Sequence, residues 1–471
     1  EVLDEAHFIG AEDPTNLLQE RTDFTQLLTF TIDGERAKDF DDAVSLEHIE
    51  GGYRLGVHIA DVSHFVQENS PLDQEALERG TSIYYSDGVI PMLPESLSNE
   101  ACSLKPNEPR LTLSAIMDFD HEANFISGTL HPSVIKSQRR FTYTEVHRML
   151  EEEEDDPLMP TLTDMHRLSQ LLRQKRFKNG SVDFQVPEPE IHIDSAGHVE
   201  RIGIAEHNSA HELIEEFMLA ANQFVALNLH ERGIPSIHRI HEAPDPERLR
   251  GFNEYIDSFG LKIPSPVRST DLQALLEKIN DRPEERVVNT LLLRTMKKAR
   301  YSETDPGHFC LGFPHYAHFT SPIRRYPDLM VHRIIKKYLK RKCPQKDKKG
   351  LYSRLAEISE QSTQMEIQAM AISREVTDLR RTQFMVDKVG HTFHGIITGV
   401  TGFGFFAELE EVFVEGLVKI SSIMDDYYLF IETEHRLIGQ KRHRSFQIGD
   451  PVKVRVTGVD LGRKQIDLTV L

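Results

Sequence analysis

Four aspartates within ten residues constrain this chain more than any other feature of its sequence. They lie within residues 31–43 and are Asp33, Asp39, Asp41 and Asp42. Carboxylates at this spacing repel one another, so a hard divalent cation is the usual reason for such a cluster. Mg²⁺, Mn²⁺ and Ca²⁺ all prefer oxygen ligands, and Mg²⁺ in particular binds a few carboxylates together with substrate phosphates. The cluster therefore predicts a metal site and favours phosphoryl-transfer chemistry.

The residues around the cluster limit how it can fold. Short apolar runs on both sides predict one strand entering it and another leaving it. Because successive residues of a strand face opposite sides, Asp39 and Asp41 would point away from Asp42 in an extended chain. The four carboxylates converge only if the backbone bends, and Gly34 permits a turn directly after Asp33.

Two other interpretations of the cluster are weaker. A solvated acidic turn is common for an arbitrary acidic run, but the flanking strands argue against it. A calcium loop of the EF-hand type needs glycine at its sixth position. Counting from Asp39, that position holds Val44, so the calcium loop is excluded.

Charge is distributed unevenly along the 471 residues. The net charge of −20 argues against nucleic acid as a partner if it is taken over the whole chain. Residues 294–349, however, carry 15 Lys and Arg against 4 Asp and Glu, so this segment can attract phosphates. A solvated helix face is the alternative interpretation of the same segment.

Length and composition predict two or three domains of a cytoplasmic protein. No apolar run is long enough to span a membrane, and no secretory signal opens the sequence. The three cysteines are scattered and suit a reducing compartment. We expect a polar, irregular leading segment over residues 1–27 and a mixed α/β body over 28–387. The body should contain helices near 206–232, 327–342 and 351–388.

Residues 388–471 change in character and predict an all-β domain. Glycines punctuate short β-type runs there, which is typical of a small closed barrel. Phe403, Phe405 and Phe406 crowd one turn and the strand after it, with basic residues nearby in sequence. Aromatic and cationic side chains together suit base stacking on single-stranded nucleic acid. We expect some of these rings to be core and one to face outward.

A second constellation precedes the predicted helix at 327–342. Arg324 and Arg325 follow Thr320 and Ser321, either of which can cap a turn. Guanidinium groups beside the free N–H groups of a helix start make a phosphate clamp. An arginine pair that bridges structural carboxylates is an equally good interpretation from the sequence alone.

These motifs together resemble the RNase II/RNase R (RNB) family, and the pattern at residues 79–84 is closest to its bacterial RNase R branch. The matching stretches are residues 32–43, 57–64, 90–94, 102–104 and 318–326, the last reading His-Phe-Thr-Ser-Pro-Ile-Arg-Arg-Tyr. Residues 402–406 and 415–417 match the family's last domain. The resemblance implies an RNB catalytic domain followed by an OB-fold RNA-binding domain of the ribosomal S-one type.

The resemblance also implies an activity. Family members are processive 3′→5′ exoribonucleases that hydrolyse single-stranded RNA to nucleoside 5′-monophosphates. By this likeness Asp33, Asp39 and Asp42 hold Mg²⁺, or Mn²⁺, in a two-metal site, and Asp41 matches the most critical catalytic carboxylate. Arg324 matches the arginine that contacts the scissile phosphate.

Contacts with RNA follow from the same resemblance. Tyr84 matches the aromatic residue that stacks on the terminal nucleotide, and Phe184 resembles the clamp at the other end of the stacked bases. Tyr143 and Glu215 resemble the pair that recognises the ribose 2′-OH.

Two departures from the family pattern affect what can be expected. The two cold-shock domains that usually precede the catalytic body, and the lysine-rich tail, do not occur in this sequence. The family suggests a monomer. A catalytically silent RNA-binding regulator on the same fold is the alternative, although such decay normally removes an aspartate or the arginine, and all are present.

Overall fold

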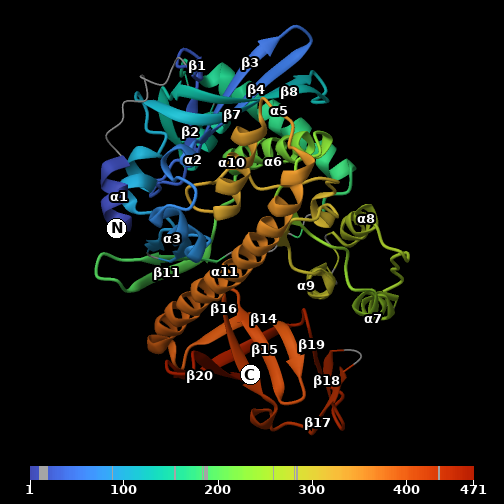
Figure 1. Cartoon of the computed structure of the whole chain (residues 1–471). Coiled ribbons are helices and arrows are strands. Elements are labelled where there is room, and N and C mark those ends of the chain that lie inside the picture. The colour runs from blue at the N-terminus through green and yellow to red at the C-terminus, as the bar shows by residue number, and fades with distance from the viewer. Residues whose placement is uncertain are drawn as a thin grey trace.

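The computed structural model describes residues 1–9, 20–86, 88–152, 155–182, 184, 189–257, 259–280, 282, 285–432 and 435–471. In Figure 1 a mixed α/β body lies above a small barrel, and one long helix runs from the first to the second. Among the described helices none combines the length and apolarity needed to cross a bilayer.

A seven-stranded sheet forms one layer of the body. Its order is β1-β8-β7-β4-β3-β2-β9, with parallel pairing only at β1–β8 and β2–β9. The strands are β1 (Thr22–Phe24), β2 (Phe30–Asp33), β3 (Asp42–Ile49), β4 (Gly52–Ala60), β7 (Pro109–Asp120), β8 (Phe125–Lys136) and β9 (Arg139–Thr142). The strands predicted before and after the aspartates are β2 and β3, and both are confirmed.

Helices pack on this sheet through one apolar core. They are α4 (Tyr143–Glu152), α5 (Met159–Lys178), α6 (Ser209–Glu231) and α10 (Tyr326–Tyr338), with α2 (Val62–Phe65) and α3 (Pro71–Arg79) beside them. Phe217 of α6 and Phe30 of β2 are fully buried in this core. The helices expected near 206–232 and 327–342 are therefore present, each shorter than predicted.

The leading segment is more ordered than the sequence suggested. Residues Val2–Ile9 form α1, which contacts α3, and the Leu72 amide donates to Glu5 Oε2 at 2.9 Å. Residues 22–24 form β1 at the edge of the main sheet. The expectation of an irregular segment is wrong for these residues because both pieces find partners far away in the sequence. The domain boundary near residue 27 stays a prediction.

The last domain is the closed barrel that the sequence predicted. Its strand order is β14-β15-β16-β21-β20. The strands are β14 (Thr392–Thr401), β15 (Gly404–Leu409), β16 (Val414–Lys419), β20 (Pro451–Asp460) and β21 (Gln465–Val470), and a three-stranded sheet of β17 (Tyr428–Ile431), β18 (Arg436–Gly439) and β19 (Ser445–Gln447) joins it.

A second apolar core links the barrel to three helices of the body. These helices are α7 (Pro246–Asp257), α8 (Ser269–Ile279) and α9 (Glu285–Thr295). The connection between the two parts is α11 (Gln345–Met385), whose 41 residues span about 60 Å at 1.5 Å per residue. It begins six residues before the predicted helix and ends near its predicted end, and it contacts both the body and the barrel.

Three pairs of short antiparallel strands also belong to the body. The first pair is β5 (Ile83–Tyr85) with β6 (Gly88–Ile90), and the second is β12 (His238–Ile240) with β13 (Arg300–Ser302). A third pair, β10 (Pro189–Ile193) with β11 (Val199–Ile204), lies beside α11.

Candidate active site

The aspartate cluster occupies the connection between two neighbouring strands of the main sheet. Asp33 is the last residue of β2 and Asp42 is the first residue of β3. Residues 34–41 between them are irregular, and the turn begins where the Ala37 amide donates to the Gly34 carbonyl at 3.1 Å. The bend that the sequence required is therefore present.

A buried serine holds this irregular segment in place. Ser103 Oγ donates to the Lys38 carbonyl at 2.7 Å and accepts from the Phe40 amide at 3.0 Å. The Leu104 amide donates to the Phe40 carbonyl at 3.0 Å, and the Ala60 amide donates to the Asp41 carbonyl at 2.8 Å. Backbone hydrogen bonds from two distant segments thus fix the path of the chain at Asp41.

Asp41 is the most enclosed of the four carboxylates, with only 5% of its surface exposed. Its Oδ1 accepts from the Ile323 amide at 2.9 Å, and its Oδ2 lies 3.8 Å from Arg324 Nε. Burial raises the pKa of Asp41 well above its ordinary value, and the Arg324 guanidinium opposes that shift. The Ile323 amide and the Arg324 guanidinium therefore both stabilise the ionised form of Asp41, which burial disfavours.

The neighbouring carboxylates resist ionisation for similar reasons. Burial and the charge of Asp42 raise the pKa of Asp33 to about 7. Burial raises the pKa of Asp42 to about 6, and Arg324 opposes it. Asp33 Oδ2 is buried and accepts no hydrogen bond from the described residues. A set of oxygen donors with raised pKa values and an unpartnered buried oxygen fits a bound divalent cation.

Arg324 and Arg325 lie in different environments. The Arg324 side chain is 42% exposed and reaches both Asp41 and Ser321 Oγ. Arg325 Nη2 lies 2.7 Å from Oδ1 of Asp328, whose side chain is completely buried. The contact of Arg325 favours the alternative in which an arginine pairs with a structural carboxylate, and the phosphate contact of Arg324 stays a prediction. A role for Arg325 in binding RNA stays a prediction.

Tyr84, in strand β5, contacts the aspartate cluster. Its ring is 45% exposed, and its hydroxyl donates to Asp39 Oδ2 at 3.3 Å. The Ser82 amide, two residues earlier, donates to the Arg324 carbonyl at 3.0 Å. The same short segment therefore positions the exposed tyrosine and the arginine around the aspartates.

Tyr143 lies near Asp33 and Asp42 at the start of α4. It follows β9, in which Thr142 is paired with Asp33 of β2. Its ring stacks on His211 of α6 with centroids 3.9 Å apart, and burial together with Asp42 and Asp33 raises the pKa of its hydroxyl. Glu215 lies one turn further along α6 and is half exposed, with Oε2 3.4 Å from His207 Nε2.

Phe184 is the remaining aromatic residue predicted in the body. It is half-buried and packs against the second apolar core. The residues beside it, 183 and 185–188, lie outside the described part of the chain. Its role as a clamp on stacked bases stays a prediction.

Sequence reasoning missed Arg140. Its Nη2 donates to the Gly34 carbonyl at 2.5 Å, and its charge lowers the pKa of Asp33. The residue comes from β9, about a hundred positions along the chain, and reaches the site only because β9 pairs with β2. No local motif marks it, so strand pairing is the only signal that could have found it.

The three phenylalanines of the barrel differ in burial, as expected from the sequence. Phe405 is fully buried and stacks on Phe446, whereas Phe403 is 56% exposed. Phe406 is half-buried, and its ring meets Phe403 edge to face with centroids 6.2 Å apart. One ring therefore faces outward.

Comparisons with known proteins agree with this architecture. Residues 21–341 match the RNB domain family, and residues 386–471 match the S1 RNA binding domain. The chain belongs to the RNB family and carries an RNA-binding domain of the S1 type after its catalytic domain.

The similar curated proteins are bacterial. Ribonuclease R 1 of Lactococcus lactis is 42% identical over all of this chain and 59% of its own length. Ribonuclease R of Aquifex aeolicus is also 42% identical, over all of this chain and 68% of its own length. The chain thus spans about three fifths of the length of the first relative and about two thirds of the second.

Solved structures give the same fold. RNase R of Mycoplasma genitalium in complex with ribose-methylated single-stranded RNA superposes with a TM-score of 0.95 at 32% identity, covering all of this chain and 75% of its own. Yeast Ssd1, a pseudonuclease, superposes with a TM-score of 0.74 at 21% identity, covering 90% of this chain and 53% of its own. The second likeness concerns the fold alone.

Proposed function

We propose that this chain is a 3′→5′ exoribonuclease that hydrolyses single-stranded RNA to nucleoside 5′-monophosphates. The observation that carries the proposal is Asp41, a buried carboxylate held between the Ile323 amide and Arg324 beside three further aspartates. Relatives named ribonuclease R, and an RNase R solved in complex with single-stranded RNA, support an RNA substrate.

The aspartates suit Mg²⁺, with Mn²⁺ as a substitute. Asp33, Asp39 and Asp42 would hold two ions together with Asp41, because all four offer hard oxygen donors. When bound, the two ions would activate water and neutralise charge on the leaving oxygen. The unpartnered Oδ2 of Asp33 supports a cation at this place rather than a hydrogen-bonded network.

The protein's own residues would bind and orient the RNA end. Arg324 is exposed enough to donate to a non-bridging oxygen of the scissile phosphate, where charge develops. The exposed ring of Tyr84 would stack on the terminal base. Tyr143 and Glu215 would contact the ribose 2′-OH, the group that distinguishes RNA from DNA.

The barrel would hold RNA further from the cleaved end. Phe403 offers an exposed ring for stacking, and the partly buried edge of Phe406 supports it. We further propose that the protein is a monomer in the cytoplasm. The three cysteines are all free in the structure, which is consistent with a reducing compartment.

A catalytically silent RNA-binding regulator is the alternative on the same fold. The complete set of four aspartates, with Arg324 directed at the most buried of them, favours the enzyme. A regulator would gain nothing from keeping buried carboxylates whose pKa values are raised by their own packing.

The deciding experiment is a time course on 5′-labelled single-stranded RNA, run with Mg²⁺, with EDTA and beside the matching DNA. We expect a short limit product without a ladder of intermediates, only from RNA and only with metal. Binding without cleavage in either Mg²⁺ or Mn²⁺ would establish the regulator instead. Release of the labelled 5′ nucleotide at early times would contradict the 3′→5′ direction.

A further inference from the structure

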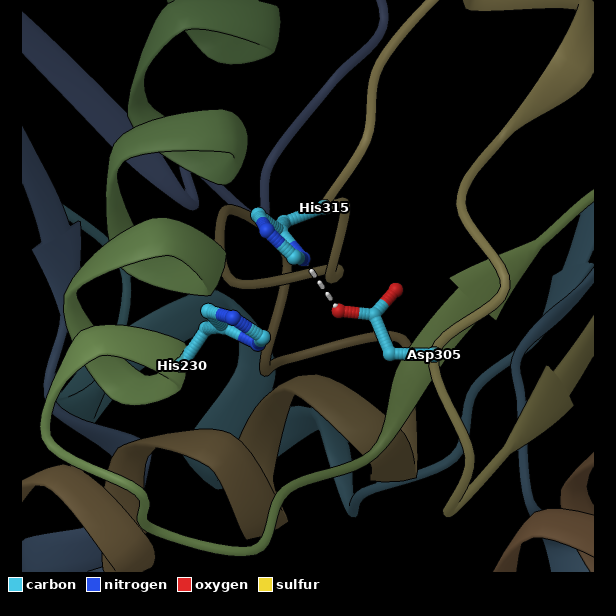
Figure 2. Close-up of side chains that lie close together, drawn as sticks. All are labelled: His230, Asp305 and His315. Carbon is cyan, nitrogen blue, oxygen red and sulfur yellow. Dashed lines mark hydrogen bonds and ion pairs between the residues drawn. The ribbon is translucent and has the colours of Figure 1, made fainter.

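A second group of metal-ligating side chains lies outside the aspartate site, at the end of α6. Its members are His230, Asp305 and His315, and one ligand atom from each lies within 4.8 Å of the others. His230 is in the last turn of α6, while Asp305 and His315 lie in the long connection between β13 and α10. Figure 2 shows the two imidazole rings side by side, with the carboxylate directed at them.

A fourth side chain approaches the same carboxylate. His238, the first residue of β12, places Nδ1 3.5 Å from Asp305 Oδ2. The His238 side chain is only 8% exposed, and its Nδ1 makes no hydrogen bond with the described residues. Asp305 Oδ1 is likewise buried without a partner there. Buried polar atoms left unpaired cost about 1–3 kcal/mol each, so two of them around one carboxylate point to a missing ligand.

Two imidazole rings lie together beside the carboxylate. The rings of His230 and His315 stack with centroids 3.7 Å apart, so their nitrogens face the same small region. Neutral imidazole nitrogens are the commonest metal ligands in proteins.

We propose that His230, Asp305 and His315 form a binding site for a divalent transition metal, Zn²⁺ above all, with His238 beside the carboxylate. Imidazole and carboxylate ligands bind Zn²⁺ tetrahedrally at about 2.0–2.2 Å, which places ligand atoms about 3.3 Å apart. The three ligand atoms lie within 4.8 Å of one another, and the hydrogen bond of 2.6 Å between His315 Nδ1 and Asp305 Oδ2 would give way to the metal. Mg²⁺ is not expected here, because it prefers oxygen ligands.

The position of the site gives the metal a structural role. It would tie the connection after β13 to α6 and β12. The same connection is already held by Asn222 of α6, which donates to Tyr316 Oη at 3.2 Å and accepts from the Phe319 amide at 2.8 Å. Four residues after Phe319, the same connection places the amide of Ile323, which donates to Asp41 Oδ1. A bound metal would therefore stabilise the base of the loop that completes the active site.

The test uses the full chain without a polyhistidine tag, stripped of metal by chelation and titrated with Co²⁺ in excess Mg²⁺. Mg²⁺ fills the carboxylate cluster, and Co²⁺ reports a nitrogen-containing, four-coordinate site by intense visible absorption. We expect one Co²⁺ per chain, displaced by Zn²⁺, and a Zn²⁺-dependent rise in Tm.

Substitutions assign the binding to these residues. His315→Gln and Asp305→Asn should each weaken Co²⁺ affinity at least about tenfold, since even outer-shell changes cost 10–100-fold at metal sites. His391→Gln, an exposed histidine, and Asp41→Asn should leave the absorption unchanged. If His315→Gln fails to fold, the Co²⁺ affinity of Asp305→Asn decides whether these residues bind the metal, because asparagine keeps the shape of the side chain.

Two results would overturn the proposal. One is the absence of Co²⁺ absorption from the parent chain in excess Mg²⁺. The other is absorption that disappears with Asp41→Asn and survives Asp305→Asn, because the ion would then lie in the aspartate cluster.

Discussion

Arg324 and Arg325 are neighbours in the sequence, but they differ in exposure and in the carboxylate that each contacts. The first is partly exposed and directed at Asp41, and the second neutralises the buried Asp328. The sequence alone could not separate them, because the difference depends on which side of the turn each side chain leaves. Their substitution should therefore affect different properties of the protein.

Arg324→Gln should lower turnover by about 10²–10³-fold, the usual effect of removing one donor to developing charge, with little change in stability. Arg325→Gln should instead lower the free energy of unfolding by about 3–5 kcal/mol, because it leaves Asp328 buried without its counter-charge. Steady-state kinetics and urea unfolding of both variants check this pair. A stable, inactive Arg325→Gln would contradict the assignment and return that residue to RNA binding.

The raised pKa values of Asp33 and Asp42 predict how metal binding depends on pH. Between the ordinary carboxyl pKa near 3.8 and the folded values of about 7 and 6, the metal-free folded state binds more protons than the unfolded chain. Stability of the metal-free protein should therefore fall as pH rises through this window. Affinity for Mg²⁺ should rise over the same range, because binding requires the ionised carboxylates.

Calorimetric titration with Mg²⁺ at pH 6 and pH 8, in two buffers of different ionisation enthalpy, measures this linkage. We expect proton release at pH 6 and weaker binding than at pH 8. Asp33→Asn should abolish most of the difference and raise the metal-free Tm at pH 8. Equal affinities with no proton release would show that these carboxylates are already ionised.

The aspartate loop shows how elements far apart in sequence build one site. The sequence predicted the two flanking strands and the turn, because alternation and Gly34 act locally. It could not identify Ser103 or Arg140, which reach the loop through contacts between distant segments. The same limit applied to α1 and β1, whose short sequences acquire structure from their partners.

Ser103→Ala should impair catalysis by releasing the loop. The Lys38 carbonyl and the Phe40 amide would lose their shared partner, at a cost of about 1–3 kcal/mol for a buried unpaired group. We expect kcat to fall more than RNA affinity, because Asp41 follows directly after Phe40. Ser169→Ala is the control, since this buried hydroxyl bonds only within α5. Equal effects of the two substitutions on kcat would argue against the role of Ser103.

At the scale of the whole molecule, the barrel and three helices of the body share one apolar core. The closed barrel and its outward ring were predictable from glycine spacing and clustered phenylalanines. The packing of α7, α8 and α9 against the barrel was not, because their apolar faces do not specify a partner. This shared core fixes the barrel relative to the body, as the proposed path of RNA from the barrel to the active site requires.

Phe403→Ala should weaken binding of a long single-stranded RNA by about 1–3 kcal/mol, the cost of losing one base stack. The affinity for a short RNA that reaches only the active site should not change. Met424→Ala is the matched control, as an apolar residue of the same domain that is 92% exposed. Fluorescence anisotropy with the two RNA lengths in EDTA measures this, and equal losses for both lengths would contradict a separate barrel contact.

The substitution Asp41→Asn tests whether Asp41 is catalytic. Asp118→Asn is the control, because it removes a remote carboxylate that is paired with Arg54. Turnover of 5′-labelled RNA in Mg²⁺ and RNA affinity in EDTA are measured for both variants and for the parent chain. We expect Asp41→Asn to bind RNA as tightly as the parent chain but to turn it over at least about a thousandfold more slowly. Turnover within tenfold of the parent would contradict a catalytic role for Asp41 and, with it, the assignment of the aspartate cluster.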